Sequence, residues 1–309
     1  MNYLKLIRLP NLIIVVLAQV LLKYGLLEPY NAETILTNFQ FFLLVFATLC
    51  IAAAGNVIND IYDVDIDKIN KPHKVIVGKR VSEKAAYNLF IALNILGVAA
   101  GFYVSNAIEK PGFAAIFIFV SGALYIYASY LKGMILIGNI VVSILVALSL
   151  VIVGLFELLP AITAVNQESQ RDVFGIILEY ALFAFYLNLM REIVKDLQDI
   201  NGDKNGDMNT LPIVIGRNRS ITLVIMLAII AIAGIIYYVY IKLYLHQVAI
   251  LYFLFLIVAP LIFFLIKAWG AYAENQKEVK DYGLLSNILK GIMVLGICSL
   301  LLYKYILLP

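Results

Sequence analysis

An apolar run that ends in a cluster of aspartates occurs twice in this chain. The first reads FLLVFATLCIAAAGNVINDIYDVDIDK at residues 42–68, and the second reads LFAFYLNLMREIVKDLQDINGDKNGD at residues 182–207. Eight of the ten aspartates in the 309-residue sequence lie in these two stretches. Each acidic cluster therefore follows directly on a segment suited to a membrane.

The composition of the whole chain supports the same environment. Hydrophobic residues make up 63%, charged residues 14%, and the mean hydropathy is +0.95. Soluble domains are about half apolar and about a quarter charged, so a soluble fold and a disordered chain are both excluded. The net charge of +3 gives no argument for a nucleic-acid partner, and the sequence says nothing about protein partners.

Apolar segments long enough to cross a bilayer recur along the chain. A spanning helix needs roughly 20 apolar residues. The sequence predicts an all-α integral membrane protein, with nine transmembrane helices in one bundle and a single domain over residues 1–309. The predicted segments are 11–27, 38–58, 84–105, 112–130, 134–158, 173–190, 219–241, 247–268 and 288–307.

The basic residues predict an orientation. With the N-terminus in the cytoplasm, all but five of the 23 lysines and arginines fall on the cytoplasmic side, as expected from the positive-inside rule. Both acidic clusters then face the cytoplasm at helix ends, and we expect the protein in the cytoplasmic membrane. Glu157, at the other side, is expected to be an interfacial glutamate.

The aspartates of the two clusters share one spacing. An offset of 136 residues relates three aspartates of the first motif, residues 56–72, to three of the second motif, residues 191–207. At about 100° per residue, each set falls on one face of a helix. The shared spacing indicates an internal repeat with two columns of carboxylates. The columns are Asp60, Asp63 and Asp67, and Asp196, Asp199 and Asp203.

Columns of like charge need a compensating cation, because carboxylates at helical spacing repel. All-oxygen ligands suit Mg²⁺, Mn²⁺ or Ca²⁺ better than zinc. Mg²⁺ usually binds one or two carboxylates together with substrate phosphates. Two facing columns would therefore clamp a diphosphate through bridging Mg²⁺. Basic residues at the depth of the acids are expected to contact phosphate, namely Lys132, Arg191 and Lys195.

At this point the motifs resemble a known family, the UbiA-type intramembrane prenyltransferases. Asn59-Asp60-x-x-Asp63-x-x-x-Asp67, followed by Asn70-Lys71-Pro72-His73, resembles the first aspartate motif of that family. Lys195-Asp196-x-x-Asp199-x-x-x-Asp203 resembles its second motif. YLKLIRLPN, SYLKGMILIGN and TLPIVIG resemble further family segments, so that the resemblance covers nearly the whole chain.

The resemblance implies Mg²⁺-dependent transfer of a prenyl group from a polyprenyl diphosphate to a lipophilic acceptor. It assigns the catalytic role to Asp63, Asp67, Asp199 and Asp203, which together with Asn59 would hold Mg²⁺ through the diphosphate. It places further residues at the diphosphate, namely Asp60, Asp196, Lys71, Lys132, Arg191, Lys195 and Arg8. Aromatic faces can stabilise an allylic cation, and the candidates are Tyr125, Tyr127, Tyr130 and Tyr186.

One position of the sequence narrows the choice of acceptor substrate. Many family members with aromatic acceptors carry a tyrosine four residues before the lysine of the second motif, where this chain has Arg191. REIVKDLQDINGD most resembles members that alkylate geranylgeranylglyceryl phosphate in lipid biosynthesis, and Arg191 would then be available to an acceptor phosphate. Hydroxybenzoate, dihydroxynaphthoate or homogentisate remain alternative acceptors, in quinone biosynthesis.

Two other functions use acidic residues in a membrane. A cation transporter would place them near the bilayer centre, whereas these clusters are predicted at helix ends. A CDP-alcohol phosphotransferase would carry a DG-x-x-AR signature, which this sequence lacks. The depth of the aspartates in the fold distinguishes transport from prenyl transfer.

Overall fold

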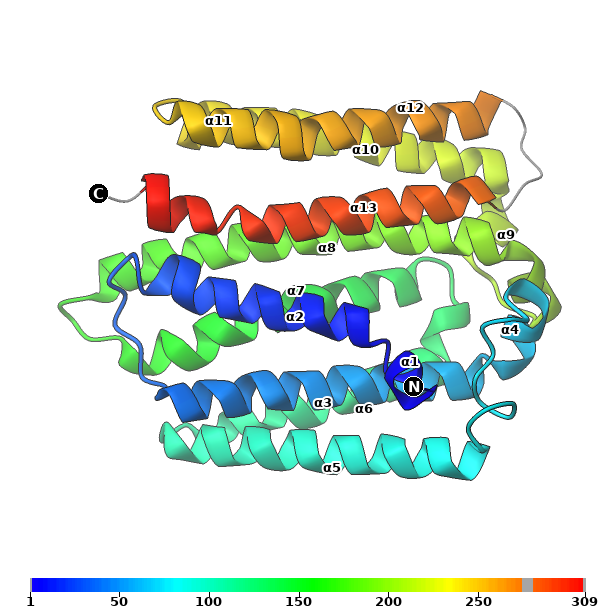
Figure 1. Ribbon diagram of the computed structural model, residues 1–309, viewed down its shortest axis with the longest axis horizontal. Helices are drawn as coiled ribbons and strands as arrows, with labels where there is room; N and C mark the ends of the chain where they lie inside the picture. The colour runs from blue at the N-terminus through cyan, green and yellow to red at the C-terminus, as the bar shows by residue number, and fades with distance from the viewer. Residues whose placement is uncertain (1, 274–279, 308–309) are drawn as a thin grey trace.

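The computed structural model describes residues 2–273 and 280–307, and long helices run side by side through this part of the chain (Figure 1). The predicted domain over 1–309 includes residues 1, 274–279 and 308–309, which lie outside the described residues. Within the described ranges, the one recorded β-type pairing is an isolated bridge between Val77 and Val81. The all-α prediction is therefore confirmed for the described residues.

The longer helices form the bundle and short helical turns connect them. The helices are α1 (Asn2–Leu6), α2 (Leu9–Leu21), α3 (Asn38–Tyr62), α4 (Val64–Asn70), α5 (Glu83–Ala107), α6 (Ala114–Ser129), α7 (Ile137–Glu157), α8 (Gln167–Asn205), α9 (Leu211–Ile215), α10 (Arg217–Lys242), α11 (Gln247–Phe253), α12 (Ala259–Ala273) and α13 (Lys280–Cys298). The turns are η1 (Leu22–Leu27), η2 (Pro111–Phe113), η3 (Leu131–Gly133), η4 (Leu159–Ala161), η5 (Leu254–Val258) and η6 (Tyr303–Leu307).

The predicted number of membrane spans is confirmed. Nine helical stretches among the described residues are long and apolar enough to cross a membrane. They are Leu9–Leu27, Asn38–Tyr62, Glu83–Ala107, Pro111–Ser129, Ile137–Ala161, Gln167–Asn205, Arg217–Lys242, Gln247–Tyr272 and Tyr282–Tyr305. The sixth is much longer than the predicted 173–190, because the polar second motif continues the same helix.

The two aspartate columns differ in their backbone. The first is interrupted, since α3 ends at Tyr62, Asp63 adopts φ −86° and ψ 0°, and α4 starts at Val64. The second lies on α8, whose 39 residues form one helix of about 58 Å. The two columns therefore have equal spacing in sequence but different backbones. The first column spans two helices that meet at Asp63, and the second lies on one continuous helix.

Helix α8 joins two apolar cores. Its first half contributes Val173 and Ile177 to a core with α2, α3, α6 and α7. Its second half contributes Leu187 and Met190 to a core with α10, α12 and α13. Figure 1 shows α8 between these groups of helices. Burial of apolar surface on both sides fixes the position of the polar end of α8.

The far end of the bundle holds a buried ion pair. Glu157 is fully buried and accepts from the Lys23 ammonium at 2.8 Å and from the backbone N–H of Leu36 at 3.2 Å. The Lys23 ammonium also lies 4.5 Å from the centre of the Phe41 ring. The expectation of an interfacial Glu157 is therefore wrong, because a lysine from a distant helix satisfies its charge inside the protein.

Candidate active site

A cavity of about 750 Å³ is lined by residues of both aspartate motifs. Figure 1 shows α4, which carries part of the first motif, beside the end of α8 that carries the second. All twelve residues proposed from the sequence line this cavity, so the fold brings both motifs to one place. They are Arg8, Asn59, Asp60, Asp63, Asp67, Lys71, Lys132, Arg191, Lys195, Asp196, Asp199 and Asp203. Their individual roles stay predictions.

The break after α3 positions the first motif. The side-chain amide of Asn59 donates to Oδ2 of Asp63 at 2.6 Å, and both residues are buried. The backbone N–H of Asp67 donates to the Asp63 carbonyl at 2.8 Å, so the first turn of α4 begins directly at the break. Asp63 and Asp67 therefore reach the cavity from adjacent turns.

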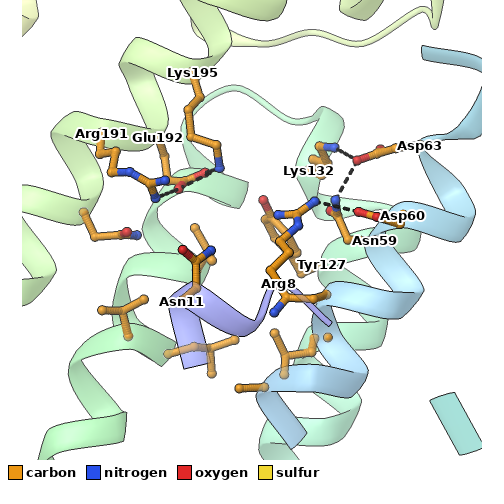
Figure 2. Close-up of a pocket in the computed structure, with 18 of the residues that line it drawn as sticks. Arg8, Asn11, Asn59, Asp60, Asp63, Tyr127, Lys132, Arg191, Glu192 and Lys195 are labelled. Carbon is orange, nitrogen blue, oxygen red and sulfur yellow. Dashed lines mark hydrogen bonds and ion pairs between the residues drawn. The ribbon is translucent and has the colours of Figure 1, made fainter. Parts of the chain in front are cut away.

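Lys132 pairs with Asp63 across the cavity (Figure 2). Lys132 lies on η3, and η3 is held close to the start of α7 by Gly138. A Cβ at Gly138 would lie 2.8 Å from the Leu131 carbonyl oxygen, so only glycine permits this approach. Burial by itself lowers the pKa of Lys132, but the Asp63 carboxylate outweighs it and the pKa is raised. Lys132 is therefore a cation.

The N-terminal segment covers the cavity next to the first motif. Arg8 adopts the left-handed conformation with φ 55° between α1 and α2. Its guanidinium donates to Oδ1 of Asp60 at 2.7 Å (Figure 2). Asn56 anchors the same turn by donating to the Ile7 carbonyl at 3.0 Å. Arg8 and Asp60, which are both predicted to contact a diphosphate, thus form an ion pair with each other in this structure.

The second motif lines the opposite side from α8. Asp196 accepts from the Asn139 amide at 2.8 Å. Glu192, one turn earlier, is buried and accepts from the Lys195 ammonium at 2.7 and 2.9 Å. Arg191 approaches Glu192 at 3.6 Å. Figure 2 shows Arg191, Glu192 and Lys195 across the cavity from Asp60, Asp63 and Lys132.

Two residues at the end of the first motif connect it to the second. The Lys71 ammonium lies 2.5 Å from Oδ2 of Asp199. The Asn70 amide donates to the Asp199 carbonyl at 2.8 Å, and its oxygen accepts from the Gly202 N–H at 2.8 Å. We call Asn70 and Gly202 the motif clamp. The clamp fixes α4, and with it Asp67, against α8.

The carboxylates fit a hard divalent cation that shares its ligands with a phosphate. Oδ1 of Asp199 is buried and has no hydrogen-bond partner among the described residues. Burial raises the pKa of Asp67, and the nearby Asp63 carboxylate raises it further. No three carboxylates, histidines or cysteines in the described ranges form a ready metal cluster. Mg²⁺ suits such a site, because it keeps few protein ligands and binds substrate oxygens.

Apolar side chains line the deeper part of the cavity. Leu12 and Val15 of α2, Val120 and Leu124 of α6, and Ile152 of α7 line this part. This wall excludes water and accommodates a hydrocarbon chain.

Of the four candidate tyrosines, Tyr127 lines the cavity. Tyr125 bonds to Tyr62 outside it, and Tyr186 donates to the Leu227 carbonyl. Tyr130 is 68% exposed. Tyr127 therefore remains as the aromatic candidate near the reacting carbon.

Sequence reasoning missed a cation that contacts the cavity lining. Lys290 of α13 donates to Oδ1 of Asn11 at 2.6 Å, and Asn11 lines the cavity beside Arg8. These residues are 279 positions apart. The available signal was a lysine near the N-terminal end of the ninth apolar segment.

Comparison with known proteins places the cavity in a family. The sequence profile of the UbiA prenyltransferase family matches residues 12–288. The chain belongs to the UbiA prenyltransferase family. The resemblance in the aspartate motifs is thus confirmed, and the rival assignments to a transporter and a phosphotransferase are set aside.

Relatives within the UbiA family include one from Methanosphaera stadtmanae named digeranylgeranylglyceryl phosphate synthase. It is 32% identical over 282 residues, which cover 90% of each chain. A structure from work on digeranylgeranylglyceryl phosphate synthase in membranes is 25% identical, with a TM-score of 0.60 and coverage of 97% and 98%. A UbiA homolog from Archaeoglobus fulgidus bound to GPP and Mg²⁺ shares the fold, with 18% identity, a TM-score of 0.59 and coverage of 97% and 99%.

The position of the aspartates agrees with family membership. Asp60 lies near the end of α3, and Asp196 to Asp203 lie within the last ten residues of α8. A transport site near the bilayer centre would place acids in the middle of such helices. The depth therefore favours prenyl transfer at a membrane boundary.

Proposed function

We propose that this protein transfers a geranylgeranyl group from geranylgeranyl diphosphate to geranylgeranylglyceryl phosphate and forms a double ether lipid. The observation that carries the proposal is one cavity lined by both aspartate motifs, with an apolar extension below them. Relatives that cover most of the chain are named digeranylgeranylglyceryl phosphate synthase. The reaction is an alkyl transfer in membrane lipid biosynthesis.

The donor diphosphate is proposed to lie between α3–α4 and α8. Asp63, Asp67, Asp199 and Asp203, with Asn59, would hold Mg²⁺ through the diphosphate oxygens. Bound Mg²⁺ would neutralise the diphosphate and make it a better leaving group. Structures of an Archaeoglobus fulgidus homolog bound to DMAPP or GPP with Mg²⁺ support this choice of metal. Lys71 and Lys132 would turn from Asp199 and Asp63 toward the phosphates.

The reaction breaks the bond between the allylic carbon and the diphosphate oxygen, and the electron pair leaves with the diphosphate. The acceptor hydroxyl oxygen forms the new ether bond, and its proton passes to the diphosphate. Lys71, Lys132 and Arg8 stabilise the negative charge that develops. Tyr127 presents its ring to the positive allylic carbon, and the apolar wall keeps water from trapping it.

A single position favours a phosphate acceptor over an aromatic one. Arg191 stands where many aromatic-acceptor members of the family carry a tyrosine, and it lines the cavity. A guanidinium suits a phosphate, because its fork of N–H donors matches phosphate oxygens. Hydroxybenzoate, dihydroxynaphthoate or homogentisate is the alternative acceptor.

We further propose that the cavity opens to the cytoplasm and that the protein resides in the cytoplasmic membrane, working as one domain. The support is the excess of lysine and arginine at the end of the bundle that carries both motifs. Membrane-impermeant labelling of a cysteine placed at exposed Lys68 tests the orientation. Labelling only after the membrane is opened agrees with the proposal, and labelling of intact cells contradicts it.

A product assay tests the function. Membranes containing the protein receive labelled geranylgeranyl diphosphate and Mg²⁺, with geranylgeranylglyceryl phosphate or an aromatic acid in separate tubes. We expect a double ether product that disappears with EDTA and with Asp63→Asn. A prenylated aromatic product would overturn the acceptor, and no product with any acceptor would overturn the transferase function.

A further inference from the structure

We propose that Arg191 and Lys290, with Lys195 and Asn11, form a second anion site that binds the phosphate monoester of the acceptor. This inference rests on the proposed function, because it divides the cavity between two phosphorylated substrates. The site lies between α2, α8 and α13. It is separate from the donor position, where Asp63 and Asp199 of the two motifs approach Lys132 and Lys71.

The geometry places these cations on one wall. Figure 2 shows Arg191 and Lys195 facing the cavity across from Lys132, with Asn11 on the segment between the two walls. Lys290 reaches this segment from α13 and donates to Asn11 at 2.6 Å. Three separate helices therefore contribute polar groups to this wall, and Lys290 is held against the cavity-lining Asn11.

Arg191 has unused hydrogen-bonding capacity. Its Nε is buried, and no acceptor among the described residues reaches it. Its closest anion is Glu192, at 3.6 Å from a terminal nitrogen, which is too long for a good hydrogen bond. The Arg191 side chain as a whole is half-buried, but a buried N–H without an acceptor is costly. An added oxyanion would supply the missing acceptor.

The charge balance differs between the two walls. On the donor side, each of Lys71, Lys132 and Arg8 has its own carboxylate partner. On the α8–α13 wall, Arg191 and Lys195 share the carboxylate of Glu192, and Lys290 donates to the neutral Asn11. Together with Asp196, which accepts from the neutral Asn139, this wall carries three cations and two carboxylates, an excess of one positive charge. A phosphate monoester carries about −1.5 to −2 at neutral pH, so this wall attracts it without a metal.

The donor diphosphate and the acceptor phosphate consequently differ in whether they need a divalent cation to bind. A diphosphate near Asp63 and Asp199 needs a divalent cation, since carboxylates would otherwise repel it. A monoester beside Arg191 and Lys290 needs none. The acceptor should therefore bind the protein in the absence of Mg²⁺, while the donor should not.

Steady-state kinetics of Arg191→Gln and Lys290→Gln test the site. We expect the KM for geranylgeranylglyceryl phosphate to rise about 10- to 100-fold, because each variant loses a charge-assisted hydrogen bond. The KM for geranylgeranyl diphosphate should stay within about twofold, and kcat at saturating acceptor should persist. The matched control is Lys242→Gln, which removes a lysine paired with Glu179 away from the cavity. It should change neither KM.

Ligand-induced thermal stabilisation of the purified protein gives a second readout that does not need turnover. Geranylgeranylglyceryl phosphate with EDTA should stabilise the wild type and Lys242→Gln but not Arg191→Gln. Donor with Mg²⁺ should stabilise all three, which also shows that the variant is folded. Inorganic phosphate serves as the probe without a lipid tail, and we expect much weaker stabilisation by it.

Failure of the proposed function and failure of the phosphate site would give different results. No double ether product from the wild type would refute the proposed function. Product from the wild type, with an unchanged acceptor KM in Arg191→Gln and Lys290→Gln, would refute only the phosphate site. A rise in donor KM in place of acceptor KM would assign these residues to the diphosphate. Equal stabilisation by inorganic phosphate would assign the site to free phosphate.

Discussion

We expect Gly202→Ala to separate the two aspartate motifs while the helix that carries the second one stays intact. A Cβ at Gly202 would lie 2.4 Å from Nδ2 and 2.6 Å from Cγ of Asn70. The Asn70 amide has to leave this position, and it then loses both bonds of the motif clamp. Asp67 on α4 is then held less firmly relative to Asp199 on α8, although the Lys71–Asp199 ion pair remains.

The magnitude follows from the two bonds. Each contributes about 0.5–1.5 kcal/mol net, so their loss costs about 1–3 kcal/mol. If the reacting geometry needs the clamp, kcat/KM falls about 5- to 150-fold. The alanine itself favours a helix by about 1 kcal/mol over glycine. We therefore expect a large loss of activity with little change in the thermal midpoint.

The assay is labelled product formation with the melting temperature measured on the same preparations. Gly234→Ala is the matched control, because it lies within α10 with open space around its Cβ. The double variant with Asn70→Ala gives a sharper test. Once Asn70 is truncated, the methyl group has room, so the second change should cost little more than Asn70→Ala alone. Wild-type kcat/KM in Gly202→Ala, or losses that multiply in the double variant, would refute the clamp.

Three further predictions concern the donor. Lys132→Gln leaves the buried Asp63 unpaired and removes a phosphate contact, so the donor KM should rise about 10- to 100-fold, and a normal donor KM would contradict this contact. Because the pKa of Asp67 is raised by burial and by Asp63, protons should compete with Mg²⁺ at a higher pH than for an ordinary aspartate. The half-saturating Mg²⁺ concentration should therefore increase as the pH falls, and a flat profile would be evidence against a metal role. Thr48 lines the cavity eleven residues before Asn59 on α3, about 16 Å deeper. Thr48→Phe should therefore lower kcat/KM for geranylgeranyl diphosphate at least about tenfold, while geranyl diphosphate is used as before. An equal effect on both donors would show that the prenyl chain does not pass Thr48.

The spans and the convergence of the aspartates could be predicted because their signals are local. Hydropathy over about 20 residues marks a spanning helix, and the 136-residue offset sets equivalent positions on two helices. The prediction that each column lies on one helix face was incomplete. Asp63 interrupts the first helix, and the sequence around it carries no glycine or proline to mark the break.

The contacts that complete the site could not be predicted. Asn70 bonds to Gly202, 132 residues away, Lys290 to Asn11, 279 residues away, and Lys23 to Glu157, 134 residues away. Such pairs depend on how helices pack, and helical periodicity does not specify it. For the same reason, burial of Glu157 was not foreseen.

The lysines that pair with Asp63 and Asp199 have a thermodynamic consequence for the proposed donor complex. A metal ion alone must displace ammonium groups from the carboxylates, and a diphosphate alone must draw those ammonium groups away and leave carboxylates uncompensated. When the metal ion and the diphosphate bind together, the metal pairs with the carboxylates and the diphosphate pairs with the ammonium groups. Every charge then keeps a counter-charge. Each ligand should therefore increase the affinity for the other by the same factor. The ion pairs of the empty site thus disfavour binding of the metal ion alone or of the diphosphate alone.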